Sequence, residues 1–279
     1  QKNAFLSEIK KFIRMNTKLA SYLHCLFLFD EQEIASSITN QSAIHPEKLS
    51  DKWENLEQVT AKDAIIQIEH IKQAYEGLLL LFGAGYIHGD IKPDNIVKNE
   101  TGFLLANFNC SEKIKKEGFS IKGTKGFIYR KKRFAANCDF NSVENDLYAF
   151  CLTFIFPYLG DSASAFTGQC FLGFFKNYQN RKVFFEKIDE IYSIENSTGL
   201  ILKEMYSYCF ALSNKNQTFK NTTLISWNLI DFAWKLGIRD VRLVGKAVEN
   251  SRVSNYEQEV AIKHFKNRVK NERSSPYFS

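Results

Sequence analysis

The chain has 279 residues, of which 44% are hydrophobic, and a formal net charge of +6. This length and apolar content predict a globular protein with a large core, and they exclude a disordered chain. The longest apolar runs fall far short of the roughly 18 residues that span a bilayer, and no cysteine spacing indicates zinc or another metal. The six cysteines therefore predict reduced core thiols and a nuclear or cytoplasmic location.

The first 45 residues are predicted to form one helix and two strands. The helix contains the run Phe5-Leu6-Ser7-Glu8-Ile9, and the strands lie around 25–29 and 34–39. The chain begins with glutamine, so we expect it to be a fragment of a longer protein.

Helices are predicted over most of the remaining chain. Apolar residues recur at intervals of three and four from Thr60, where a capping residue opens the pattern, to Gly83, where it stops. The run from Leu147 to Phe156 is apolar nearly all round and predicts a buried helix that ends at Pro157. Further helices are predicted over 183–194, 200–212, 223–236 and 241–270.

The eight residues from His88 to Asn95 read His-Gly-Asp-Ile-Lys-Pro-Asp-Asn. Phosphoryl transfer uses an aspartate, a lysine and an asparagine at this spacing. Asp90 would accept the hydroxyl proton, Lys92 would approach the γ-phosphate, and Asn95 would hold a magnesium ion. The run resembles the H-R-D-x-K-x-x-N catalytic loop of the protein kinases.

Other segments resemble kinase motifs in the same order. Asn107-Phe108-Asn109 follows a short apolar strand, twelve residues past Asn95, at the place of D-F-G. Thr124 lies in a G-T-x-x-Y/F-like stretch. Asp146 matches the aspartate that opens the family's buried helix and caps the backbone of the catalytic loop. Glu8 matches the helix glutamate that pairs with a strand lysine near the nucleotide.

Four departures from the kinase pattern follow; the first two indicate that this activity is lost, and the last two concern regulation and the anchoring of the substrate platform. Asparagine replaces the D-F-G aspartate, so position 107 has no carboxylate for magnesium. No G-x-G-x-x-G run precedes His88, and Val260-Ala261-Ile262-Lys263 is a chance match on the wrong side of the loop. Gly89 replaces the H-R-D arginine, and A-P-E becomes Tyr-Arg-Lys at 129–131. Asp139-Phe140-Asn141 is rejected as an alternative D-F-G because no activation segment fits before Asp146.

The resemblance implies an α+β, protein-kinase-like fold with two lobes. Residues 1–45 would form a reduced or truncated small lobe, 46–273 a mostly helical large lobe, and 274–279 a loose end. Asp90, Lys92, Asn95 and Thr124 would be catalytic remnants, and Glu8 and Asn107 remnants of the cofactor site, with no cofactor or metal bound. Asp90 and Asn95 have an alternative role, in which they only hydrogen-bond the loop.

A basic segment between 113 and 133 carries nine cations and one acid. It is either a solvated loop or a docking surface for an acidic or phosphorylated protein. The residues assigned to that surface are Lys122, Lys125, Arg130, Lys131, Lys132 and Arg133. A second basic cluster (Lys263, Lys266, Arg268, Lys270 and Arg273) lies on the last helix, but no reader motif for nucleic acid accompanies it.

The catalytic loop is most similar to that of the Bub family of spindle-checkpoint kinases and pseudokinases. This resemblance implies a pseudokinase that serves as a protein-binding scaffold, with a place at kinetochores and in chromosome segregation. Two alternatives remain open: a divergent active Ser/Thr kinase, and a basic nucleic-acid-binding module on a kinase frame. No membrane contact is expected.

Overall fold

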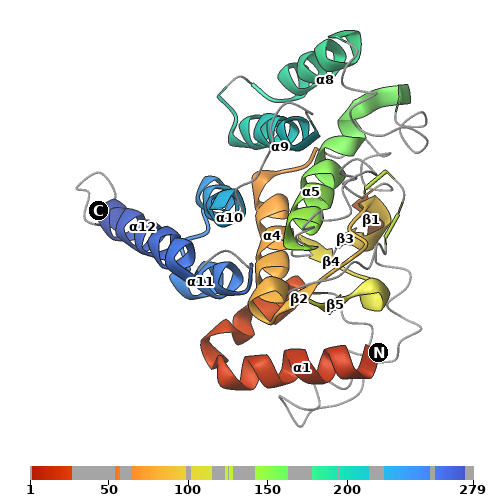
Figure 1. Cartoon of the computed structure of the whole chain (residues 1–279). Coiled ribbons are helices and arrows are strands. Elements are labelled where there is room, and N and C mark those ends of the chain that lie inside the picture. Colours follow the sequence, from red (N-terminus) through yellow and green to blue (C-terminus); the bar gives the residue numbers. More distant parts are fainter. Residues whose placement is uncertain are drawn as a thin grey trace, which may run out of the picture.

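The computed structural model describes residues 2–26, 54–56, 65–98, 102–114, 123–124, 126–127, 142–162, 178–193, 195–213, 223–251 and 255–273. Helices dominate this part of the chain, and small antiparallel sheets lie between them (Figure 1). The fold is therefore α+β with mostly helical content, as predicted. None of the described helices is long and apolar enough to cross a membrane.

Helix α4 (Ile68–Gly83) runs through the centre of the fold (Figure 1). Its residues from Leu78 to Phe82 are all fully buried, because different neighbours cover each side of the helix. These neighbours are the 3-10 helix η1 (Thr17–Cys25), strand β4 (Phe103–Leu105) and helix α11 (Val241–Asn250). Segments from both ends of the chain thus pack on one central helix.

Two small sheets bring the predicted site segments together. Strands β1 (Glu54–Asn55), β3 (Ile96–Lys98) and β4 form one antiparallel sheet in the order β1-β3-β4. Strands β2 (Tyr86–Ile87) and β5 (Glu112–Lys113) form the other. Because Ile96 pairs with Leu105, the chain just before β3 lies beside the chain just after β4.

The helix prediction before the catalytic loop has the wrong start. Helix α4 begins at Ile68, residues 65–67 are not helical, and Ile65 is 59% exposed. The carbonyl of Ile66 accepts a hydrogen bond of 2.8 Å from the hydroxyl of Tyr192, which fixes this segment outside the helix. Thr60 lies outside the described residues.

The predicted helix over 241–270 is two helices. Helix α11 ends at Asn250, and helix α12 (Asn255–Arg273) follows. The Asn250 side chain donates 2.8 Å to the carbonyl of Gly83, so it caps α4 at the point where α11 stops. This long-range contact gives no periodic signal in the sequence.

The remaining predictions hold with shifted bounds. Helix α1 (Lys2–Met15) contains the predicted N-terminal helix, and the others are α5 (Ser142–Ile155), α8 (Tyr178–Ile191), α9 (Ser197–Ser213) and α10 (Thr223–Lys235). The α-helix α5 ends just before Pro157, as predicted, and a 3-10 helix, η6 (Phe156–Ser162), follows it. Cys25 belongs to η1 and not to a strand, Leu26 forms one bridge to Leu105, and the rest of both N-terminal strand predictions lies outside the described residues.

One cation of the second basic cluster, Arg268, packs on Trp234 of α10. Arg239 and Arg268 lie over its ring, 3.7 and 4.0 Å from the centroid, and Arg239 also pairs with Glu272. Arg268 therefore contributes to the packing of α12 on α10, whereas Lys263 is exposed. Lys266 and Lys270 are exposed as well, so three of the predicted cations face solvent on α12.

Candidate functional site

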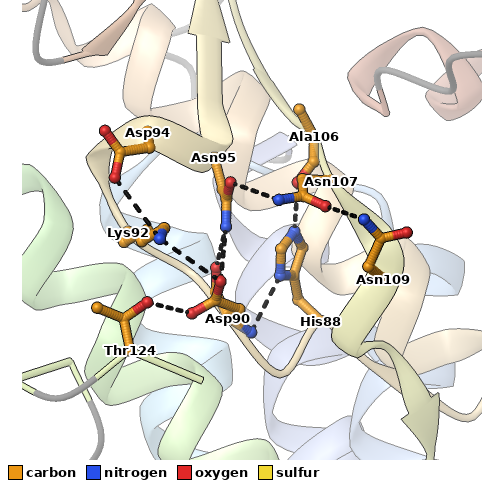
Figure 2. A network of polar contacts seen from close by, with 9 residues as sticks. All are labelled: His88, Asp90, Lys92, Asp94, Asn95, Ala106, Asn107, Asn109 and Thr124. Carbon is orange, nitrogen blue, oxygen red and sulfur yellow. Dashed lines mark hydrogen bonds and ion pairs between the residues drawn. The ribbon is translucent and has the colours of Figure 1, made fainter. Parts of the chain in front are cut away.

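The site is built where the loop before β3 meets the chain after β4. His88, Asp90, Lys92 and Asn95 come from the loop, and Asn107 comes from the end of β4 (Figure 2). The register of β3 and β4 sets this meeting, since the backbone N–H of Ala106 donates 2.9 Å to the carbonyl of Asn95. Thr124 approaches the same loop from a separate segment.

Asp146 on α5 holds the start of the loop. Its carboxylate accepts hydrogen bonds from the backbone N–H groups of His88 (2.5 Å) and Gly89 (3.0 Å). Asp146 is 1% exposed, and this burial raises the pKa of its carboxyl to about 7. The two N–H donors lower the pKa and offset part of this rise. The predicted cap of the loop by this aspartate is confirmed.

The partners of His88 fix its protonation. Its Nε2 lies 2.8 Å from the carbonyl of Ala106, which can only accept, and its Nδ1 lies 3.3 Å from the backbone N–H of Asp90, which can only donate. The ring is therefore neutral with the proton on Nε2. Complete burial lowers the pKa of His88 to about 4.

His88 and Asp146 should give the protein opposite pH dependences that largely cancel. Below pH 6.5 the histidine is protonated in the unfolded chain, whereas in the folded protein it stays neutral down to about pH 4. Acidification from pH 7 to pH 5 therefore lowers the free energy of unfolding by about 2 kcal/mol through His88. Because the pKa of Asp146 is raised in the folded protein, its carboxyl is protonated there at a pH where the unfolded chain is still ionised. Acidification from pH 7 to pH 5 therefore raises the free energy of unfolding by about 2 kcal/mol through Asp146.

Urea denaturation at pH 7 and pH 5 separates the two groups. We expect His88→Phe to become more stable at pH 5 than at pH 7, and Asp146→Asn to become less stable. The same direction of change in both variants would contradict the assignment.

Asp90 is held by donors on both carboxylate oxygens. Thr124 Oγ1 donates 2.7 Å to Oδ1, and Asn95 Nδ2 donates 3.1 Å to Oδ2 and 2.7 Å to the backbone carbonyl of Asp90. Lys92 Nζ lies 3.8 Å from the same Oδ2 and 3.6 Å from a carboxylate oxygen of Asp94. The structure thus brings together the four predicted catalytic remnants.

The side-chain amides of Asn95, Asn107 and Asn109 are joined in series by hydrogen bonds that all run in one direction, called the amide ladder below (Figure 2). Asp90 can only accept, so Asn95 must turn its NH2 group toward Asp90 and its Oδ1 toward Asn107. Asn107 then donates from Nδ2 to Asn95 Oδ1 over 3.1 Å, and its own Oδ1 accepts from Asn109 Nδ2 over 2.8 Å. The charge of Asp90 therefore determines the orientation of all three amides.

Asparagine also suits the backbone at position 107. Asn107 has φ 62° and ψ 68°, which is the left-handed region, and no other described residue except glycine has a positive φ. Asparagine and aspartate enter this region more readily than other residues with a side chain. Asn107 therefore suits this turn and places no charge there.

The residues do not fit a magnesium ion of the kinase type. Magnesium binds protein through one or two carboxylates, whereas Asn95 and Asn107 offer neutral amides. The oxygen of Asn95 that would face the metal accepts from Asn107 instead. Among the residues that the structure describes, no three His, Cys, Asp or Glu side chains are grouped to hold a metal.

Gly89, which is predicted to match the arginine position of the kinase motif, has a backbone conformation that requires glycine. Its φ is +81°, and a Cβ there would lie 2.6 Å from the carbonyl oxygen of Cys110. Gly89→Ala should therefore destabilise the protein by about 2 kcal/mol, since the clash with Cys110 adds to the roughly 1 kcal/mol that the left-handed backbone alone costs. Urea denaturation measures the loss.

Gly85→Ala is the matched control for this prediction. Gly85 has nearly the same φ, +80°, but nothing lies within 4 Å of an added Cβ. Its loss should be about 1 kcal/mol, the conformational part alone. Equal losses in the two variants would contradict a steric role for Cys110.

Glu8 has a partner that the sequence did not indicate. Its carboxylate lies 3.6 Å from Lys113 Nζ, and Phe5, one turn earlier on α1, stacks on Phe108 at 5.2 Å between ring centroids. Phe108 in turn lies 5.1 Å from the ring of His88. Helix α1 is thus tied to the chain that follows Asn107.

The predicted partner-binding residues lie outside the described part of the chain. Lys122, Lys125 and the run from 130 to 133 lie outside the described residues. The contributions of Asn109 and Lys113 were missed, because their partners come from a turn geometry and from a distant helix. A polar residue two positions after Asn107 was the only available signal.

The chain matches no protein-family model and no curated protein.

Proposed function

We propose that this chain is a protein-kinase-like domain that has lost metal-dependent phosphoryl transfer and acts as a protein-binding scaffold. In this proposal α1 and η1 belong to a reduced small lobe, and α4, α5, the small sheets and the C-terminal helices form the large lobe. The spacing of Asp90, Lys92, Asn95 and Asp146 and their hydrogen bonds support the assignment.

One hydrogen bond carries the proposal, the contact of 3.1 Å from Asn107 Nδ2 to Asn95 Oδ1. In a working kinase site, both positions would turn oxygen atoms to a shared cation. Here an N–H group joins them, so the site is closed without an ion. A folded site that needs no nucleotide or metal suits a scaffold, because its shape is constant.

The similarity of the catalytic loop to the Bub family supports a narrower version of this proposal. In that version the chain is a module of a kinetochore protein in the nucleus and serves chromosome segregation. It would bind another protein, and it would contact neither nucleic acid nor membrane as its main partner.

Thermal unfolding with and without magnesium-ATP tests the proposal. We expect no shift in Tm, whereas a ligand present at a hundred times its Kd would add about 2.7 kcal/mol of stability. ATP with EDTA and magnesium alone are the controls. A shift of several degrees that requires both components would overturn the proposal.

A second candidate function is a divergent Ser/Thr kinase. The contacts of Asp90 with Thr124 (2.7 Å) and Lys92 (3.8 Å) favour it, because they hold the proton acceptor and the cation that the transfer step uses. Transfer of labelled phosphate by the wild type that disappears in Asp90→Asn would establish this function.

A further inference from the structure

The end of helix α1 and the start of η1 carry three cations with no ionic partner. Lys11, Arg14 and Lys18 are exposed, and none of them forms an ion pair in the described part of the chain. Several cations on other helices pair with a carboxylate, among them Lys182, Lys203 and Lys235. These three residues, together with Met15, are called the α1 patch below.

The orientation of the α1 patch is fixed by the opposite face of the helix. Phe5, Leu6, Ile9, Phe12 and Ile13 recur at intervals of three and four and are all buried in the core. The helix cannot rotate to hide its cations without exposing this face. The one acid on α1, Glu8, is already paired with Lys113, so nothing on α1 neutralises the patch.

Met15, the last residue of α1, is 69% exposed. It follows Arg14 directly, and Lys11 and Lys18 lie four residues before and three residues after it. Methionine and arginine are enriched at protein interfaces, where methionine adapts to varied apolar partners. A phosphate backbone would use the cations only, so the apolar side chain favours a protein.

We infer that the α1 patch binds an acidic segment of a partner protein, with carboxylates on Lys11, Arg14 and Lys18 and one apolar side chain on Met15. This inference rests on the proposed scaffold role and gives that role a surface and a partner chemistry. Opposite charge speeds association and makes it sensitive to salt, while the apolar contact adds selectivity.

Fluorescence anisotropy with a labelled synthetic peptide of Glu-Glu-Leu-Glu repeats tests this surface on the full chain. We expect Lys11→Glu/Arg14→Glu to weaken binding about tenfold. The matched control, Lys263→Glu/Lys266→Glu on α12, makes the same change in net charge and should have little effect. Met15→Ser should weaken binding about fourfold and should not alter binding of a Glu-Glu-Gly-Glu peptide.

Three results would overturn the inference that the α1 patch binds an acidic protein segment. They are equal weakening of peptide binding by both double variants, equal affinity for the leucine and glycine peptides, or tighter binding of duplex DNA than of the peptide through the same residues. None of these results involves the site at Asn107. The thermal unfolding measurement with magnesium-ATP is therefore independent of the peptide measurement. A negative result for peptide binding can be told apart from a result that contradicts the proposed function.

Discussion

Asp146→Ala should destabilise the protein by about 4 kcal/mol, the largest effect expected of any single change considered. The substitution leaves the backbone N–H groups of His88 and Gly89 buried without an acceptor. Each such group costs about 1–3 kcal/mol. The loop from His88 to Asn95 would also lose its connection to α5. Urea denaturation at pH 8, where the carboxyl is ionised, measures the loss.

Asp240→Ala is the control for this experiment. Asp240 also accepts from two backbone N–H groups, those of Arg242 and Leu243, but at the half-buried start of α11, where its other carboxylate oxygen accepts from the hydroxyl of Tyr22. Loss of such a cap costs about 1 kcal/mol. If the two variants lose the same stability, burial does not strengthen the contacts of Asp146 and the account of the loop is wrong.

Asn107→Asp should cost about 3 kcal/mol without divalent cations and should make stability depend on them. The change removes the donor to Asn95 Oδ1 and places a carboxylate against that oxygen, close to Asp90. A divalent cation would then relieve the repulsion, so millimolar magnesium or manganese should restore most of the loss. Thermal unfolding in EDTA and in added metal measures both effects.

Asn107→Ala separates the lost donor from the added charge. It should also be less stable than the wild type, because it loses the hydrogen bond and the left-handed backbone disfavours alanine. Added metal should not restore it. Metal rescue of the alanine variant, or no rescue of the aspartate variant, would show that charge at 107 does not control the site.

The site was more predictable from sequence than its surroundings. The spacing from Asp90 to Asn95 to Asn107 identifies residues that do meet, because a short loop and a hairpin join them and the hairpin register fixes the distance. Asp146 was predictable from its position before an apolar helix. The direction of the amide ladder was not predictable, since it follows from contacts in space.

The fold was predictable where periodicity decides it. Helices α1, α4, α5 and α8 to α10 have apolar patterns that their burial requires. The errors lie where a distant contact overrides the local pattern. Tyr192 holds Ile66 outside the helix that was predicted to begin at Thr60, and the side chain of Asn250 caps Gly83 at the point where α11 ends. No local signal distinguishes these positions.

Broadening of side-chain amide NMR signals by manganese is the most direct test of the central claim. Manganese, added with ATP, broadens signals near any site where it binds in place of magnesium. Because Asn107 already occupies the oxygen of Asn95 with an N–H group, the amide signals of both residues should keep their widths at millimolar manganese. Selective broadening of these two signals at low manganese concentration would contradict the account.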